Sequence, residues 1–236
     1  MEDMQVLINE IKEGQKVEFF EEKDGRRFSN KSLFPIKDAV PTFIELHTLT
    51  GLVEYIKWEA PKSCAIHVLD YNKVELISII EGAFKQRATY AAVQYDTIAL
   101  PIDDYISQEN FIISLQSSFV QDETTANILQ IISTLTDGTV GTYVDDGLAQ
   151  KVTVSAGVSS NATAKVPNPV ALRPYRTFLE VEQPLSKFVL RLKSQSDGRM
   201  PAIGLFAADG GEWRNQARMN IKKYFAEQLP DMPCIA

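Results

Sequence analysis

Basic side chains in the C-terminal part of the chain offer the clearest chemistry, the binding of an anion. Arg214, Arg218 and Lys222 recur every four residues, which places them along one face of a helix. Further basic residues upstream alternate along a strand or flank a tyrosine. Gathered together, they could hold phosphates bidentately, and the tyrosine could stack on a base. The candidate anion-binding or assembly face consists of Arg173, Tyr175, Arg176, Arg191, Lys193, Arg214, Arg218 and Lys222.

The charge of the chain is unevenly distributed along the sequence. Residues 1–164 hold 13 basic and 24 acidic side chains, a net charge of −11, whereas residues 165–223 carry a net charge of +6. This layout indicates either an anion-binding face or complementary surfaces on which copies of the protein assemble. The basic side chains could also pair with acidic ones within one chain or across a subunit boundary, or remain solvated. The sequence leaves these alternatives open.

The other reactive side chains form no pattern typical of a catalytic or metal site. His47 and His67, the two histidines, have no partner ligands at metal-binding spacing. Cys64 and Cys234 are isolated, which favours reduced thiols over a disulfide framework or a zinc site. No serine lies in a G-x-S-x-G motif, and neither cysteine has a base nearby in the sequence. We therefore expect no cofactor, no metal and no enzymatic activity.

Two pairs of adjacent carboxylates could bind Mg²⁺ if the fold brought them together. They are Asp103 with Asp104 and Asp145 with Asp146, and Mg²⁺ prefers such oxygen ligands. Adjacent acids in turns are more often solvated, so we do not predict a metal site there.

The segment ADGGEW, residues 208–213, joins a predicted strand to a predicted helix, where free backbone N–H groups could bind phosphate. It lacks the glycine spacing of a dinucleotide-binding loop and the Lys-Ser/Thr of a P-loop. Asp209 and Glu212 instead have the spacing of a capping box, in which side chains satisfy those N–H groups. We therefore predict that Asp209 caps the helix.

A sheet and a helix must position the basic residues. Residues 188–193 alternate as in a strand with one solvated face. Residues 202–208 are almost entirely apolar and include Gly204, which predicts a central strand with a close neighbour at the glycine. Asp197-Gly198 supplies the turn between them. The helix that follows should pack on the sheet through Trp213, Ala217, Ile221, Tyr224 and Phe225.

The preceding part of the chain mixes strands and helices. Apolar spacing predicts a helix over residues 4–11, and Asp24-Gly25 predicts a hairpin of residues 16–22 and 26–29. Helices are also predicted after Thr48 or Thr50, after Ser107 and after Asp122, each of which could be an N-cap. Strands are predicted over residues 43–47, 63–70, 73–81, 88–95, 139–144 and 149–158, and a surface linker over residues 159–169.

This order of elements predicts an α+β fold with antiparallel or mixed sheets. We expect an N-terminal α+β region over residues 1–100, a central helical hairpin over residues 101–136 and a strand-rich region over residues 137–236, whose C-terminal helix packs on the sheet. The sequence has no apolar run of membrane-spanning length and no signal-peptide pattern at its acidic N-terminus. We therefore expect no membrane partner and a cytoplasmic location.

The sequence contains the segments VPNPVALRPYRTFLEVEQPLSKFVLRL, GLFAADGGEWRNQARMNIKKYF, TLTGLVEYIK and QRATYAAVQYD. These segments resemble a group of uncharacterised bacteriophage and prophage proteins. In the order of its elements the chain is also similar to the prophage YfdQ-like family. The resemblance implies a phage-encoded protein in the cytoplasm of a bacterial host cell, and it brings no catalytic residues with it.

Two hypotheses follow from the charge layout and the resemblance. In the first, the protein is a non-enzymatic phage protein that self-assembles into a homo-oligomer, such as a ring or closed shell, through its acidic and basic faces. In the second, it binds a nucleotide or nucleic acid through its basic C-terminal face, in phage replication or in counter-defence. Affinity for a polyanion that falls steeply with salt would distinguish the second hypothesis from the first.

Overall fold

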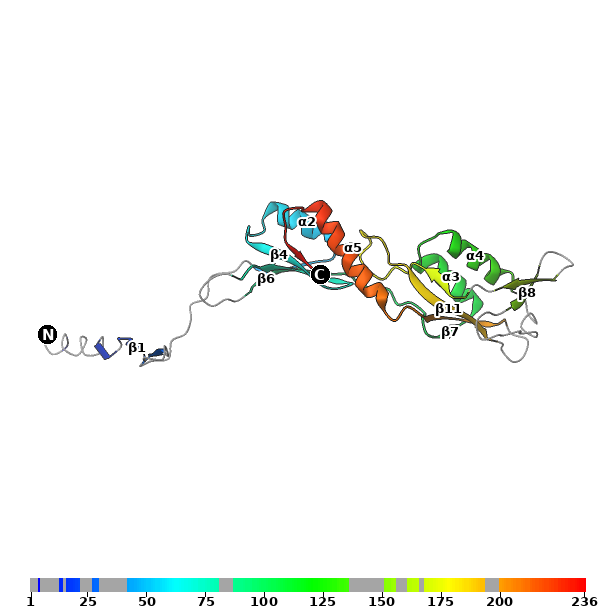
Figure 1. Cartoon of the computed structure of the whole chain (residues 1–236), viewed down its shortest axis with the longest axis horizontal. Coiled ribbons are helices and arrows are strands. Elements are labelled where there is room, and N and C mark those ends of the chain that lie inside the picture. The colour runs from blue at the N-terminus through cyan, green and yellow to red at the C-terminus, as the bar shows by residue number, and fades with distance from the viewer. Residues whose placement is uncertain are drawn as a thin grey trace. The chain divides into compact units, whose positions relative to one another are not determined.

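The computed structural model describes residues 4, 13–14, 16–21, 27–29, 42–80, 87–135, 151–155, 161–165, 168–193 and 200–236. The chain divides into two compact units, Met1–Val40 and Pro41–Ala236. The predicted α+β class, with mixed and antiparallel sheets, is confirmed (Figure 1). The predicted division into regions 1–100, 101–136 and 137–236 differs from these two units and stays a prediction.

The first unit contains a β-hairpin. β1 (Phe19–Glu21) and β2 (Arg27–Ser29) pair antiparallel. Asp24-Gly25 lies between them in the sequence, so the predicted hairpin is confirmed. Most of the helix predicted over residues 4–11 lies outside the described residues.

The second unit contains a five-stranded mixed sheet in the order β13-β4-β5-β6-β3. β4 (Cys64–Asp70), β5 (Lys73–Ser78) and β6 (Thr89–Gln94) form an antiparallel meander, as their sequence patterns predicted. β3 (Ile44–Leu46) and β13 (Cys234–Ile235) add to its two edges in parallel orientation. The sheet therefore combines segments that are far apart in the sequence.

Two helices, α2 (Leu49–Trp58) and α5 (Glu212–Gln228), pack on the five-stranded sheet (Figure 1). Thr48 caps α2, because its hydroxyl oxygen accepts a hydrogen bond from the N–H of Gly51 at 3.1 Å. The buried side chains between these helices and the sheet form the first core. They include Leu49, Leu52, Ile66, Leu76, Val93, Phe178, Ile221 and Phe225.

A second, antiparallel sheet of the same unit has the order β10-β11-β12-β7. Its strands are β10 (Val170–Leu172), β11 (Ser186–Lys193), β12 (Ala202–Ala207) and β7 (Tyr105–Ile106). β12 lies between β11 and β7, so the predicted central strand is confirmed. A Cβ atom at Gly204 would lie 2.9 Å from the ring of Tyr105, which is the close neighbour that the glycine predicted.

A helical hairpin packs on the second sheet (Figure 1). It consists of α3 (Gln108–Ser118) and α4 (Glu123–Ser133), and Ser107 and Asp122 cap these helices as predicted. The buried side chains between hairpin and sheet form the second core. They include Phe111, Leu115, Ile128, Ile132, Leu172, Phe188, Leu190 and Ile203.

Of two further strands, the first lies within the strand predicted over residues 149–158, and the second corrects the prediction of a linker. β8 (Lys151–Ser155) and β9 (Asn161–Lys165) pair as an antiparallel ribbon. The prediction of a surface linker over residues 159–169 is therefore wrong for residues 161–165, which form β9. Its polar composition concealed a strand because pairing with β8 satisfies the backbone groups of β9 whatever the side chains are. The strand predicted over residues 139–144 lies outside the described residues.

The start of α5 corrects the predicted capping box. Gly211 is the N-cap residue, and no side chain caps the helix. Asp209 accepts a hydrogen bond from the N–H of Gly211 at 3.0 Å, so its carboxylate closes the turn before the helix. The prediction that Asp209 caps the helix is wrong because Gly210 and Gly211, both at positive φ, add turn residues between the aspartate and the first helical turn.

Asp122 leads to a prediction about stability and pH. The N–H of Thr125 donates to its Oδ1 at 2.9 Å, and this backbone hydrogen bond lowers the pKa of the Asp122 carboxyl. The stability that the carboxylate adds is therefore present above the ordinary aspartate pKa and lost as the pH falls through the lowered pKa. Asp122→Ala should destabilise the protein by about 1 kcal/mol at neutral pH, and by less below about pH 4.

Urea denaturation of both proteins across this pH range measures the difference. Asp122→Asn is the control, because an amide oxygen still caps a helix, and it should lose less stability than the alanine variant at neutral pH. A loss for Asp122→Ala that is the same at acid and neutral pH would show that the ionised carboxylate is not the stabilising group.

Candidate anion-binding pocket

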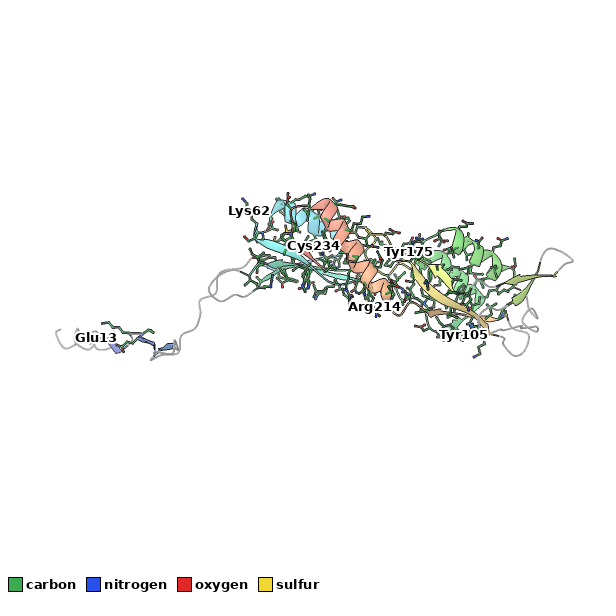
Figure 2. The ribbon with its side chains drawn as sticks, in the orientation of Figure 1. Glu13, Lys62, Tyr105, Tyr175, Arg214 and Cys234 are labelled. Atoms are coloured by element: carbon green, nitrogen blue, oxygen red, sulfur yellow. The ribbon has the colours of Figure 1, made fainter. Side chains whose placement is uncertain are left out.

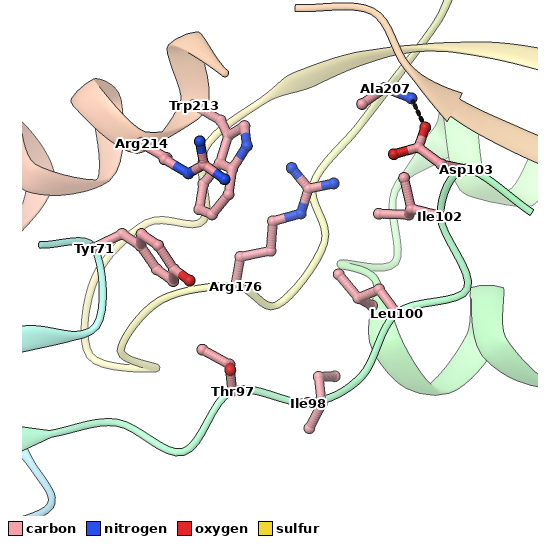
Figure 3. A pocket seen from close by; sticks show the side chains of 10 residues that line it. All are labelled: Tyr71, Thr97, Ile98, Leu100, Ile102, Asp103, Arg176, Ala207, Trp213 and Arg214. Atoms are coloured by element: carbon pink, nitrogen blue, oxygen red, sulfur yellow. Dashed lines mark hydrogen bonds between the residues drawn. The ribbon is translucent and has the colours of Figure 1, made fainter. Parts of the chain in front are cut away.

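An open pocket of about 280 Å³ lies where segments of both sheets meet in the second unit (Figure 3). Tyr71, in the turn between β4 and β5, lines it together with the first turn of α5. Residues 97–103, which connect β6 to β7, line it from another side. Arg176 and Arg214 both line this cavity, which we call the arginine pocket; Figure 2 labels Arg214 in the first turn of α5.

Arg176 is a charged residue in a buried position. Only 8% of it is exposed. Its guanidinium carbon lies 4.6 Å from the centre of the Trp213 ring and 5.2 Å from that of Phe188. Arg214 also contacts the Trp213 ring, at 5.3 Å. Trp213 therefore holds both guanidinium groups beside the pocket through cation–π contacts.

The electrostatic surroundings of Arg176 are only partly compensated. Burial lowers the pKa of Arg176 by disfavouring its charged form; Asp209 raises it, Arg214 lowers it further and Asp103 raises it. An arginine nevertheless stays charged at neutral pH. No carboxylate among the described residues forms an ion pair with Arg176 within 4.0 Å. Figure 3 shows its guanidinium between Trp213 and Asp103, where it faces the cavity.

A buried glutamine fixes the backbone at Arg176. The N–H groups of Arg176 and Thr177 donate to Oε1 of Gln183 at 3.0 and 3.3 Å. Nε2 of Gln183 in turn donates to the carbonyl oxygens of Thr177, Phe178 and Val181 at 3.0 to 3.4 Å. Five hydrogen bonds from one side chain therefore define the path of this loop.

The same loop is attached to the first sheet and its helices. The hydroxyl group of Thr177 donates to the carbonyl oxygen of Tyr71. Glu180 accepts hydrogen bonds from the N–H groups of Leu49 and Thr50 at 2.8 and 3.4 Å, at the start of α2. These bonds attach the loop that carries Arg176 to the backbone of Tyr71 and to the start of α2.

Asp103 lies on the side of the pocket away from α5 (Figure 3). Its backbone is in the left-handed region, with φ of 67°, which aspartate tolerates better than most residues. Its N–H donates to the carbonyl oxygen of Leu205 at 2.8 Å, and its Oδ1 accepts from the N–H of Ala207 at 2.9 Å. These bonds attach the segment of residues 97–103 to the end of β12.

Two other arginines of the predicted face pair with acidic side chains of the same chain. Arg173 lies 3.3 Å from Asp122 and 3.8 Å from Glu182. Arg218 lies 2.9 Å from Asp70. For these two arginines, the structure shows the intramolecular pairing that the sequence left as one alternative.

The remaining predicted residues lie outside the arginine pocket. Tyr175 is half-buried and lines a separate pocket with Arg173. Arg191 and Lys193 lie on β11, with the Lys193 ammonium 5.4 Å from the centre of the Tyr105 ring. Lys222 is half-buried on α5. Of the eight predicted residues, Arg176 and Arg214 are the two that line the arginine pocket.

Sequence reasoning missed most residues of this pocket, among them Trp213, Asp103 and Tyr71. Trp213 was assigned only to the apolar side of the helix and Asp103 only to a possible metal pair, and Tyr71 was given no role at the site. The single available signal was the adjacent pair Trp213-Arg214, which stands beside the glycine turn.

The other reactive groups form no cluster of metal ligands in the described part of the chain. There, no three His, Cys, Asp or Glu side chains could hold a metal ion, and no helix is long and apolar enough to cross a membrane. Cys64 and Cys234 are free thiols, and burial raises the pKa of both, which disfavours the nucleophilic thiolate. Asp145 and Asp146 lie outside the described residues.

Comparison with known proteins identifies no relative. No protein-family model, no curated protein and no solved structure matches the chain.

The buried glutamine gives a prediction about stability. Gln183→Ala leaves the buried N–H groups of Arg176 and Thr177 without their acceptor, and each such group costs about 1–3 kcal/mol. We expect a loss of about 2–4 kcal/mol in the free energy of unfolding, measured by urea denaturation. Gln216→Ala is the control, because this glutamine is exposed and donates from its side chain to Asn220 at 2.8 Å on the protein surface, and it should change stability by less than about 0.5 kcal/mol. Equal effects of the two variants would contradict the role of Gln183.

Proposed function

We propose that the protein binds a small phosphate-bearing ligand in the arginine pocket. The observation that carries the proposal is the guanidinium group of Arg176, which is buried, faces the cavity and has no carboxylate of the described residues in ion-pair contact. Arg214 adds a second guanidinium group on the same tryptophan ring. Guanidinium groups bind phosphate through paired hydrogen bonds, so two of them in one cavity suit such a ligand.

The alternative is that Arg176 has only a structural role. Its contacts with Trp213 and Phe188 stabilise its charge, and Asp209 and Asp103 lie near enough to raise its pKa. Yet a buried charge without a hydrogen-bonded counter-ion is costly. An anion in the pocket would supply the missing acceptors, which is why we favour ligand binding.

Tryptophan fluorescence provides a direct test. The chain has two tryptophans, and Trp58 is 83% exposed on α2, so Trp58→Phe leaves Trp213 as the single reporter of the pocket. In this background, pyrophosphate and nucleoside diphosphates should change the emission of Trp213 with saturation. The affinity should fall as the salt concentration rises, because the interaction is electrostatic.

Substitutions at the arginines separate ligand binding from a structural role. Arg176→Met keeps a long side chain between the rings but removes the charge, and it should weaken binding at least tenfold while leaving stability unchanged or higher. Arg214→Gln should also weaken binding. Lys223→Gln, on the exposed side of α5, is the control, since Lys223 lies outside the pocket and its ion pair with Glu227, at 4.0 Å, is exposed. Unchanged phosphate binding in Arg176→Met would contradict the proposal. The absence of phosphate binding in the parent protein, together with a loss of stability in Arg176→Met, would also contradict it.

A second candidate function is self-assembly. Large apolar side chains are exposed on the loop that carries Arg176, where Leu179 and Leu185 are 64% and 53% exposed. Exposed apolar side chains on a loop can mark a protein-protein contact. Together with the resemblance to phage and prophage proteins, this observation makes a phage-encoded homo-oligomer our second proposal.

Native mass spectrometry tests the assembly proposal. We expect a discrete multiple of the 26.4 kDa chain, and Leu179→Ser combined with Leu185→Ser should reduce it to the monomer. Leu69→Ser, at a leucine 37% exposed on β4, is the control and should leave the multiple intact. A monomeric parent protein at micromolar concentration would contradict self-assembly without affecting the pocket.

A further inference from the structure

The arginine pocket contains a hydrogen-bond acceptor, the carboxylate of Asp103, in addition to its two guanidinium groups. One hydrogen bond to this carboxylate is found among the described residues, from the N–H of Ala207 to Oδ1 at 2.9 Å. A carboxylate can accept about four hydrogen bonds. The unused capacity faces the cavity that Arg176 and Arg214 also line (Figure 3). A ligand that fills this pocket therefore meets both donors and an acceptor.

An apolar surface completes the pocket. Ile98, Leu100 and Ile102 lie on the segment that leads to Asp103 and line the cavity. Ile98 is 43% exposed, so part of its apolar surface is open to a ligand in the cavity. The pocket therefore offers an apolar face beside its charged groups.

The ring of Trp213 already contacts three side chains of the pocket. Besides its contacts with Arg176 and Arg214, its centroid lies 4.8 Å from that of Tyr71, with the two rings tilted by 58°. The tryptophan thus holds the guanidinium groups in place. A flat apolar part of a ligand would pack on the isoleucine and leucine side chains of residues 98–102, which also line the cavity.

We propose that the ligand of the arginine pocket is a nucleotide. Its phosphates bind Arg176 and Arg214, its ribose hydroxyl groups donate to Asp103, and its base packs on the apolar side chains of residues 98–102. This inference rests on the proposed phosphate binding. Pyrophosphate or inorganic phosphate would gain nothing from Asp103 and would be repelled by it, whereas ribose hydroxyl groups turn the same carboxylate into a binding partner.

Asp103→Asn is the decisive variant because it preserves the local structure. Asparagine tolerates the left-handed backbone of this position, where φ is 67°. Its amide oxygen can still accept the hydrogen bond from the N–H of Ala207. Asp104→Asn is the matched control, since Asp104 is exposed, does not line the pocket and accepts a similar hydrogen bond from the N–H of Tyr105 at 2.7 Å.

Isothermal titration calorimetry with three probes tests the inference. The probes are the tightest-binding of ADP, GDP, CDP and UDP, its 2′,3′-dideoxy form, and pyrophosphate. In the parent protein, the ribonucleotide should bind about tenfold more tightly than its dideoxy form. In Asp103→Asn this preference should disappear, while the affinity for pyrophosphate stays the same or increases. Asp104→Asn should behave like the parent protein.

Each contrary outcome has a separate meaning. Equal affinities for the ribonucleotide and its dideoxy form, both dependent on Arg176, would overturn the nucleotide inference and leave phosphate binding intact. A parallel loss of affinity for all three probes in Asp103→Asn would show that Asp103 is only structural, and would also overturn it. If none of the three probes bound the parent protein, the proposed function would fail together with the inference.

Discussion

The amide group of Gln183 is the interaction on which the architecture of the second unit most depends. Its five hydrogen bonds define the loop between β10 and β11. This loop leaves the second sheet at β10, places Phe178 and Val181 in the first core, and returns to the second sheet at β11. The two cores thus share one segment of chain, whose polar backbone groups would otherwise be buried without partners. The position of Arg176 is a direct consequence of this loop.

The arginine pocket follows from that geometry. The loop places the guanidinium group of Arg176 beside two aromatic rings. One is Trp213 on α5, the helix that packs on the first sheet, and the other is Phe188 of the second core. Contacts with two aromatic rings allow a buried cation to persist without an ion pair. The group lines a cavity that a phosphate could enter, and it has no ion pair there with a carboxylate of the described residues. Stability and binding are linked here, since Trp213 and Phe188 both bury the guanidinium group and determine its position beside the cavity.

Local patterns predicted most of the fold, whereas the pocket depends on long-range contacts. Thr48, Ser107 and Asp122 were predictable as helix caps because capping involves residues two or three apart. Gly204 was predictable as a close-contact position because a glycine interrupts an apolar strand pattern, but its neighbour Tyr105 lies far away in the sequence. By contrast, β9 is polar and is defined by its pairing with β8, and Gln183 is defined by partners that only the folded loop supplies. Arg176 was recognised as basic, but its burial and its separation from Arg173 could not be read from a single sequence.

A crystal structure of the protein grown with a nucleoside diphosphate at moderate salt would test phosphate binding most directly. We predict that the phosphate groups lie within hydrogen-bond distance of the guanidinium groups of both Arg176 and Arg214, with the ribose against Asp103. The opposite result would be a pocket closed by direct ion pairs from Arg176 to Asp103 or Asp209, with the nucleotide absent or bound elsewhere. That result would make Arg176 a structural cation and would contradict the proposed function.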